Sequence, residues 1–101
     1  MTERTLPDDA VEERFVTASG PGGQNVNKVA TAVHLRVNVF RLGLSPESYR
    51  RLKVIAGSRL TQDGTLIILA QRFRTQEANR EDARARVIAM LDKADEREAR
   101  R

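Results

Sequence analysis

The sequence contains no cysteine and only one histidine, His34. Disulfide bonds and thiolate metal sites are therefore impossible, and a metal site built from several histidines is excluded as well. A protein without cysteine suits a reducing compartment. No apolar run approaches the ~20 residues that a membrane-spanning helix needs. We therefore expect no metal, no cofactor and no membrane, and the simplest interpretation is a soluble cytoplasmic protein.

The beginning of the chain lacks the basic character of a targeting signal. Residues 1–13 contain five acidic residues and one basic residue, Arg4, and this composition fits neither a secretory nor a mitochondrial signal. Pro7 interrupts any regular pattern there, so residues 1–10 are expected to form an irregular lead-in. The length of 101 residues is enough for one domain, which would span residues 1–101.

Aromatic residues are scarce, but positive charge is not. Four aromatic side chains, Phe15, Phe40, Tyr49 and Phe73, are too few for a platform that stacks single-stranded RNA bases. Residues 14–86 nevertheless contain thirteen Lys and Arg against five Asp and Glu. Such an excess on a small domain is typical of a polyanionic partner, usually nucleic acid, although a solvated charged surface is the alternative. We expect contacts with the backbone of folded RNA.

The pattern of apolar residues predicts an α+β fold. Residues 11–19 and 32–40 are expected as strands, and the second of these alternates between apolar and polar side chains. Ser45 and Pro46 should begin a helix that Gly57 ends, and Asp63-Gly64 should form a tight hairpin. The continuous run Leu66 to Leu69 is typical of a strand covered on both faces.

The last part of the chain predicts a long helix. From Thr75 onward, apolar residues recur at helical spacing, whereas residues 93–101 are rich in charge and are expected to fray into solvent. The order strand–strand–helix–strand–helix then predicts a short mixed sheet covered by two helices. His34, on the polar side of its strand, should face the surface or RNA.

Three of the six glycines lie within four residues, at Gly20, Gly22 and Gly23, and Gln24 follows them. Lys and Ser/Thr do not follow the last glycine, and Asn25 stands where a dinucleotide motif requires its third glycine, so both nucleotide-binding patterns fail. Glycines permit backbone angles and close approaches that other residues disfavour. The run is therefore either a simple turn between strands or a protruding loop that presents backbone groups and a neutral amide.

The longer string from Ala18 to Val33, ASGPGGQNVNKVATAV, closely resembles the Gly-Gly-Gln signature of class I peptide-chain release factors. The resemblance continues through residues 58–61, Asp63-Gly64 and residues 71–82, and it covers most of residues 5–92. Among members of that superfamily, the chain is most similar to the small single-domain ribosome-rescue factors, which act as peptidyl-tRNA hydrolases on stalled ribosomes.

The resemblance implies a site that the protein completes within the ribosome. Gly22, Gly23 and Gln24 would be the catalytic residues, and the peptidyl-tRNA ester in the large-subunit peptidyl-transferase centre would be the substrate. The main-chain N–H of Gln24 would stabilise the transition state, and its side chain would order the pocket. Gln24 is also the position that a glutamine methyltransferase would modify. No room is left for domains that recognise stop codons, so release would be independent of the codon.

The resemblance implies further contacts with ribosomal RNA for six residues: Asn25, Asn27, Lys28, Arg59, Arg72 and Arg74. The protein is expected to act as a monomer. The two asparagines could instead brace the loop, and each arginine could instead form a weak surface ion pair. The small rescue factors usually carry a Lys/Arg-rich tail after the domain, of which residues up to Arg101 contain little. A non-catalytic RNA-binding module and a fragment of a stop-codon-dependent factor remain the alternative functions.

Overall fold

The structure, a computed structural model, describes residues 5–17 and 30–99. Its strands and α-helices follow one another in the expected order: β1 (Val11–Val16), β2 (Ala32–Asn38), α1 (Pro46–Ala56), β3 (Thr65–Ala70) and α2 (Gln76–Ala99). The described part also contains short 3-10 helices: η1 (Asp8–Ala10), η2 (Val39–Leu42) and η3 (Gly57–Arg59). The α+β class is confirmed.

The sheet is antiparallel throughout, so the expected mixed sheet is wrong. Its strand order is β1-β2-β3, and Asn38 at the end of β2 lies opposite Thr65 at the start of β3. A parallel third strand would require the connection to cross the length of the sheet before the strand begins. Here the chain passes through α1 and returns to the end it left, where Val39 N donates a 2.9 Å hydrogen bond to Gly64 O.

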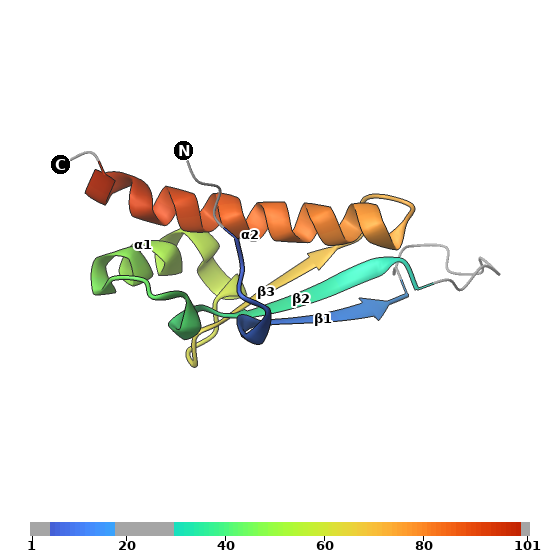
Figure 1. Ribbon diagram of the computed structural model, residues 1–101, viewed down its shortest axis with the longest axis horizontal. Coiled ribbons are helices and arrows are strands. Elements are labelled where there is room, and N and C mark those ends of the chain that lie inside the picture. Colours follow the sequence, from blue (N-terminus) through green and yellow to red (C-terminus); the bar gives the residue numbers. More distant parts are fainter. Residues whose placement is uncertain (1–4, 18–29, 100–101) are drawn as a thin grey trace.

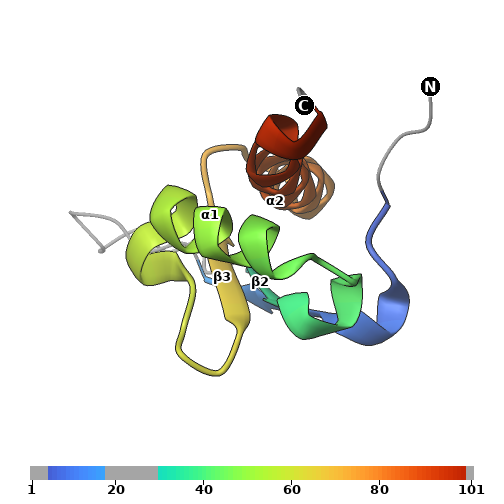
Figure 2. The same ribbon diagram turned by 90° about the vertical axis from the view of Figure 1, so that its left-hand side faces the viewer.

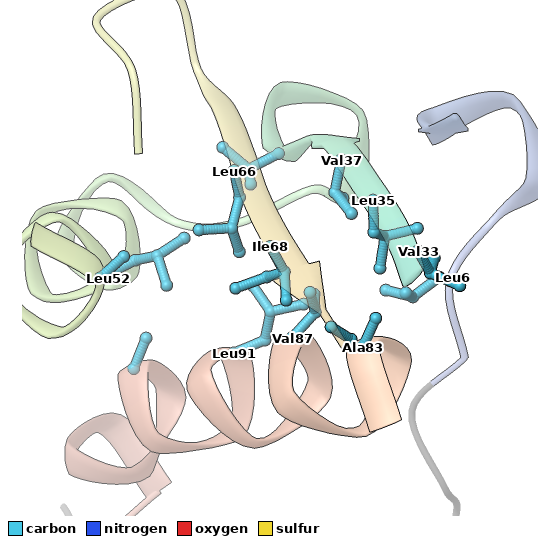
Figure 3. Packing of buried hydrophobic residues seen from close by; sticks show 14 residues of the cluster. Leu6, Val33, Leu35, Val37, Leu52, Leu66, Ile68, Ala83, Val87 and Leu91 are labelled. Atoms are coloured by element: carbon cyan, nitrogen blue, oxygen red, sulfur yellow. The ribbon is translucent and has the colours of Figure 1, made fainter. Parts of the chain in front are cut away.

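The two helices lie on the same side of the sheet. Helix α2 runs along one face of β2 and β3, and α1 packs against α2 at the end where β3 begins (Figures 1 and 2). The buried side chains of strands and helices meet between these layers (Figure 3). The cluster consists of Leu6, Val33, Leu35, Val37, Val39, Leu52, Ala56, Leu66, Ile68, Ala70, Ala83, Val87, Leu91 and Ala94.

The described residues cover strand β3 on one face only, which corrects the interpretation of its continuous apolar run. Leu66 and Ile68 are buried against the helices, whereas Leu69 remains 43% exposed. Leu69 lies opposite His34 in the sheet, so the partly buried His34 shares the open face with it, as the alternation predicts. The run therefore contributes one buried row and one partly solvated row.

The predicted boundaries of the first helix and of the hairpin are confirmed. Ser45 Oγ accepts a 3.0 Å hydrogen bond from Ser48 N at the start of α1, and Gly57 follows its last residue. Gly64 N donates to Thr61 O in the hairpin, and Leu60 pairs with Leu66 across it. The second strand is shorter than expected because Asn38 Oδ1 accepts a hydrogen bond from Phe40 N and begins η2.

The ends of the described chain are more ordered than the sequence suggests. Leu6 is buried within the expected irregular lead-in, and η1 follows it. Helix α2 continues to Ala99, and its later turns pack on α1: Ser48 Oγ donates a 2.5 Å hydrogen bond to Asp95 Oδ1, and Arg51 Nε donates one to Ala94 O. None of the described helices is long and apolar enough to cross a membrane.

Candidate functional site

Strands β1 and β2 frame the glycine-rich run. Gly22, Gly23 and Gln24, and with them Asn25, Asn27 and Lys28, lie outside the described residues. Val16 at the end of β1 lies directly opposite Ala32 at the start of β2. Opposite Cα atoms in an antiparallel pair are about 4.5–5.5 Å apart. The two ends of the connection that contains the motif therefore leave the sheet side by side.

The same end of the sheet receives two further elements. Ala70 at the end of β3 lies opposite Val33, one residue into β2. After a short connection α2 begins there, at the end of the molecule opposite α1 (Figure 1). Thr75 caps the helix, because its Oγ1 accepts a 3.1 Å hydrogen bond from Ala78 N. The described chain thus brings the flanks of the motif, the connection 71–75 and the first turn of α2 together.

Asn79 is a fully buried polar side chain at this junction. Its Nδ2 donates hydrogen bonds to Thr31 O at 2.8 Å and to Phe73 O at 3.1 Å, and its Oδ1 accepts one from Phe73 N at 2.9 Å. Two carbonyls on one side and an N–H on the other define which end of the amide is nitrogen. Asn79 therefore joins the chain after the motif to the connection that precedes α2.

Gln76 provides a second amide contact to the same stretch of chain. The side chain is exposed, and its Nε2 donates a 2.6 Å hydrogen bond to Ala30 O. Because Ala30 and Thr31 are consecutive, amides from the first turns of α2 hold two successive carbonyl groups. These carbonyls belong to the sixth and seventh residues after Gln24.

The strand before the motif is fixed to α2 by a charged contact. Glu13 of β1 accepts hydrogen bonds from Arg84 Nε at 2.7 Å and Arg80 Nε at 3.1 Å. Burial raises the pKa of the Glu13 carboxyl, but the hydrogen bonds and charges of Arg84 and Arg80 outweigh burial and bring the pKa below its ordinary value. Both flanks of the motif are thus tied to the same helix.

Two of the expected RNA-binding arginines lie beside the flanks of the motif and the start of α2. Arg72 and Arg74 belong to the connection between β3 and α2, and both are exposed. The Arg72 guanidinium lies 5.2 Å from the ring centre of Phe73, a side chain that is itself 43% exposed. Neither arginine forms an ion pair with any residue in the described ranges. No carboxylate of the described residues therefore neutralises their charges.

Arg59 lies apart from them. It ends η3, and the next residue, Leu60, pairs with Leu66 near the start of β3. Four residues of strand, at about 3.3 Å each, separate Leu66 from Ala70, so about 13 Å of strand divides the two ends. The structure therefore does not bring Arg59 together with Arg72 and Arg74, although Arg59 is also exposed and unpaired among the described residues.

Sequence reasoning did not single out Gln76 and Asn79 as site residues. A signal for Asn79 exists: it precedes Ala83, Val87 and Leu91 at steps of four, so it occupies the buried stripe of α2. A polar residue in such a stripe needs hydrogen-bonding partners. Its partner Thr31 is 48 residues away, and the sequence pattern cannot identify it. The described residues contain no group of His, Cys, Asp and Glu that could hold a metal ion.

Comparison with known proteins gives similarities over nearly the whole chain. The profile of the RF-1 domain family matches residues 1–101. A Pseudomonas putida protein named peptidyl-tRNA hydrolase ArfB is 48% identical over 97 residues, which are 95% of this chain and 70% of that protein. The meiotically up-regulated gene 82 protein of Schizosaccharomyces pombe is 33% identical over 93 residues, which cover 87% of this chain and 50% of that protein.

Proposed function

Since the chain belongs to the RF-1 domain family of class I release factors, we propose that it is a codon-independent ribosome-rescue factor. It hydrolyses the ester of peptidyl-tRNA on stalled ribosomes and releases the nascent peptide. The observation that carries this proposal is the 48% identity to peptidyl-tRNA hydrolase ArfB across 95% of the chain. The chain itself has the Gly-Gly-Gln triplet at residues 22–24.

The proposed chemistry uses the triplet without a titrating group. Hydrolysis requires a water molecule placed against the ester carbonyl and hydrogen-bond donors where negative charge develops. The main-chain N–H of Gln24 is the proposed donor, and its side-chain amide orders the pocket and favours water. Gly22 and Gly23 allow the backbone to pass close to RNA. An amide cannot act as a general base, so proton transfer uses water and RNA hydroxyl groups.

The frame around the motif suits a loop that must reach into another molecule. Its flanks leave the sheet side by side, and both are tied to α2 through Glu13 and Asn79. A loop that is fixed at both ends can be presented as a unit to the peptidyl-transferase centre. We assign Asn25, Asn27 and Lys28 to contacts with ribosomal RNA or to bracing of the loop.

The partner of the exposed arginines is, in this proposal, the ribosomal RNA backbone. Arg72 and Arg74 stand near the motif's flanks and would contact phosphates there, whereas Arg59 would contact RNA about 13 Å or more away. We further propose that the chain is a single release-factor catalytic domain, acts as a monomer in the cytoplasm and is methylated at Gln24 by a glutamine methyltransferase.

The test is release of a labelled peptide from ribosomes stalled on a message without a stop codon. The expected result is stoichiometric release that does not depend on the last codon. Free peptidyl-tRNA in the absence of ribosomes should be hydrolysed poorly, because in this proposal the active site is formed by the protein and the peptidyl-transferase centre together. Ribosome binding without release would indicate a non-catalytic RNA-binding module, and release only at stop codons would indicate part of a codon-dependent factor.

A further inference from the structure

The carbonyl groups of Ala30 and Thr31 are held from one side by one helix. Gln76 donates to the first at 2.6 Å and Asn79 to the second at 2.8 Å. Backbone carbonyls at this point precede β2, whose ladder with β1 begins at Ala32. The two amides therefore fix the chain at Ala30 and Thr31, directly before the residues that the hydrogen bonds of the sheet hold.

The two amides differ in what they do for the fold. Asn79 is fully buried and also bonds both backbone polar groups of Phe73, so its loss would leave several polar groups of a partly buried junction without their partner. Gln76 is exposed, and the contact with Ala30 O is the hydrogen bond that its side chain makes within the described residues. An exposed glutamine with one such bond contributes little to global stability. Its hydrogen bond acts locally, on the carbonyl group of Ala30.

We propose that Gln76 and Asn79 are positioning residues for peptide release, which hold the chain that follows the Gly-Gly-Gln triplet in the orientation that catalysis requires. This inference rests on the function proposed above. Catalysis by a positioned donor is sensitive to displacement: an error of about 1 Å can reduce the rate about a hundredfold. Gln76 and Asn79 act through the backbone of Ala30 and Thr31 and do not touch the substrate.

Position 76 allows an unusually clean test. Gln76 is the first residue of α2, where a negative charge interacts favourably with the helix dipole. Gln76→Glu keeps the shape of the side chain and removes the donor, while α2 itself is not weakened. Gln76→Lys restores a donor to Ala30 O. Glu77→Ala, at the next exposed position of the same turn, is the matched control.

The experiment measures kcat and KM for peptide release from ribosomes stalled on a message without a stop codon, together with thermal stability. Gln76→Glu is expected to lower kcat about ten- to a hundredfold with KM and melting temperature unchanged, and Gln76→Lys to recover most of the loss. Asn79→Asp, which keeps the acceptor and loses both donors, should lower kcat and melting temperature together.

The outcomes separate this inference from the function on which it rests. Wild-type kcat in Gln76→Glu would overturn it, and so would a raised KM at constant kcat, which would mean that Gln76 touches RNA. Absence of release by the wild-type protein would instead overturn the proposed function. The backbone nitrogen chemical shift of Thr31 reports on the hydrogen bond to Ala30 O without ribosomes. It should move in Gln76→Glu and return in Gln76→Lys, and an unchanged shift would also overturn the inference.

Discussion

Glu13 on β1 and Arg84 on α2 are joined by a 2.7 Å hydrogen bond, although 71 positions separate them in the sequence. Arg80 donates to the same carboxylate oxygen at 3.1 Å, and the Glu13 side chain is only 18% exposed. The contact fixes β1, the edge strand before the motif, against α2. The same helix also holds the chain after the motif, through Asn79. A charge on one carboxylate therefore supports the frame of the proposed site.

Stability should depend on the ionisation of Glu13. Burial raises the pKa of this carboxyl, yet Arg84 and Arg80 together bring it below the ordinary value of 4.5. A carboxyl whose pKa is lower in the folded state adds stability above its unfolded pKa and loses that contribution as pH falls through its folded pKa. Glu13→Gln should therefore cost roughly 1–2 kcal/mol at pH 7 and flatten the acid side of the stability curve.

Urea denaturation of the wild-type protein and Glu13→Gln at a series of pH values below 7 measures this difference. Glu12→Gln is the control, because Glu12 is 60% exposed and its contacts with Arg14 and Arg36 are 3.5 and 3.7 Å long. Equal losses in the two variants would contradict a special role for Glu13.

Substitutions in the triplet should separate its members by their roles. Gly23→Ala and Gly22→Ala should abolish release with binding retained, because in the proposed role a Cβ would meet RNA and would cost roughly 1–3 kcal/mol wherever the loop needs backbone angles that favour glycine. Gln24→Ala should release slowly, because its main-chain donor remains. Single-turnover release and ribosome binding are measured side by side, with Val54→Ala, a change at an 84% exposed side chain on α1, as control. Release at the wild-type rate by Gly23→Ala would refute the catalytic assignment.

Ribosome affinity should fall steeply with salt, and two arginines should carry part of that dependence. Replacing Arg72 and Arg74 by Gln should reduce the slope of log K against log salt by about 1–2, since each lost phosphate contact removes about 0.7–0.9. Release at saturating protein should not change. Arg41→Gln serves as control, because Arg41 is already paired with Asp9 at 3.2 Å. An unchanged slope in the double variant would place the RNA contacts elsewhere.

The hairpin before β3 should be sensitive to a single methyl group. Gly64 has φ +83°, and a Cβ there would overlap the Phe40 ring. Gly43 has φ +71° with nothing nearby, so Gly43→Ala measures the backbone strain alone, roughly 1–3 kcal/mol. Gly64→Ala should cost more, and adding Phe40→Ala should recover the excess. Chemical denaturation of the three variants decides this, and equal costs at the two glycines would show that the ring moves away freely.

Local patterns predicted most elements of the fold because their causes are local. The cap at Ser45, the turn at Asp63-Gly64 and the apolar stripe of α2 each act within a few residues, and all are found in the structure. The end of β2 was missed because Val39 continues the alternation and is buried, although it belongs to η2.

What the sequence could not supply depends on contacts between distant residues. Whether β3 is covered on one face or two depends on where α1 packs, and α1 lies beside α2 and leaves Leu69 partly exposed. The direction of β3 also depends on distant contacts, because the chain returns after α1 to the end of β2, where Asn38 lies opposite Thr65. At the site, the motif itself carried the prediction, whereas the hydrogen bonds from Gln76 and Asn79 join residues 46 and 48 positions apart. No periodicity links such pairs.

Helix α2 extends from Gln76, beside the motif's flanks, to Ala99, beyond its contacts with Ser48 and Arg51 of α1. At 1.5 Å per residue its 24 residues measure about 36 Å. Hydrogen bonds hold the helix near both ends, to Ala30 and Thr31 at its start and to α1 in its later turns. Its length and direction relative to the rest of the fold are therefore set. A contact made by a partner at the far end would therefore lie at a set distance from Gln76 and from the Ala30 carbonyl that Gln76 holds.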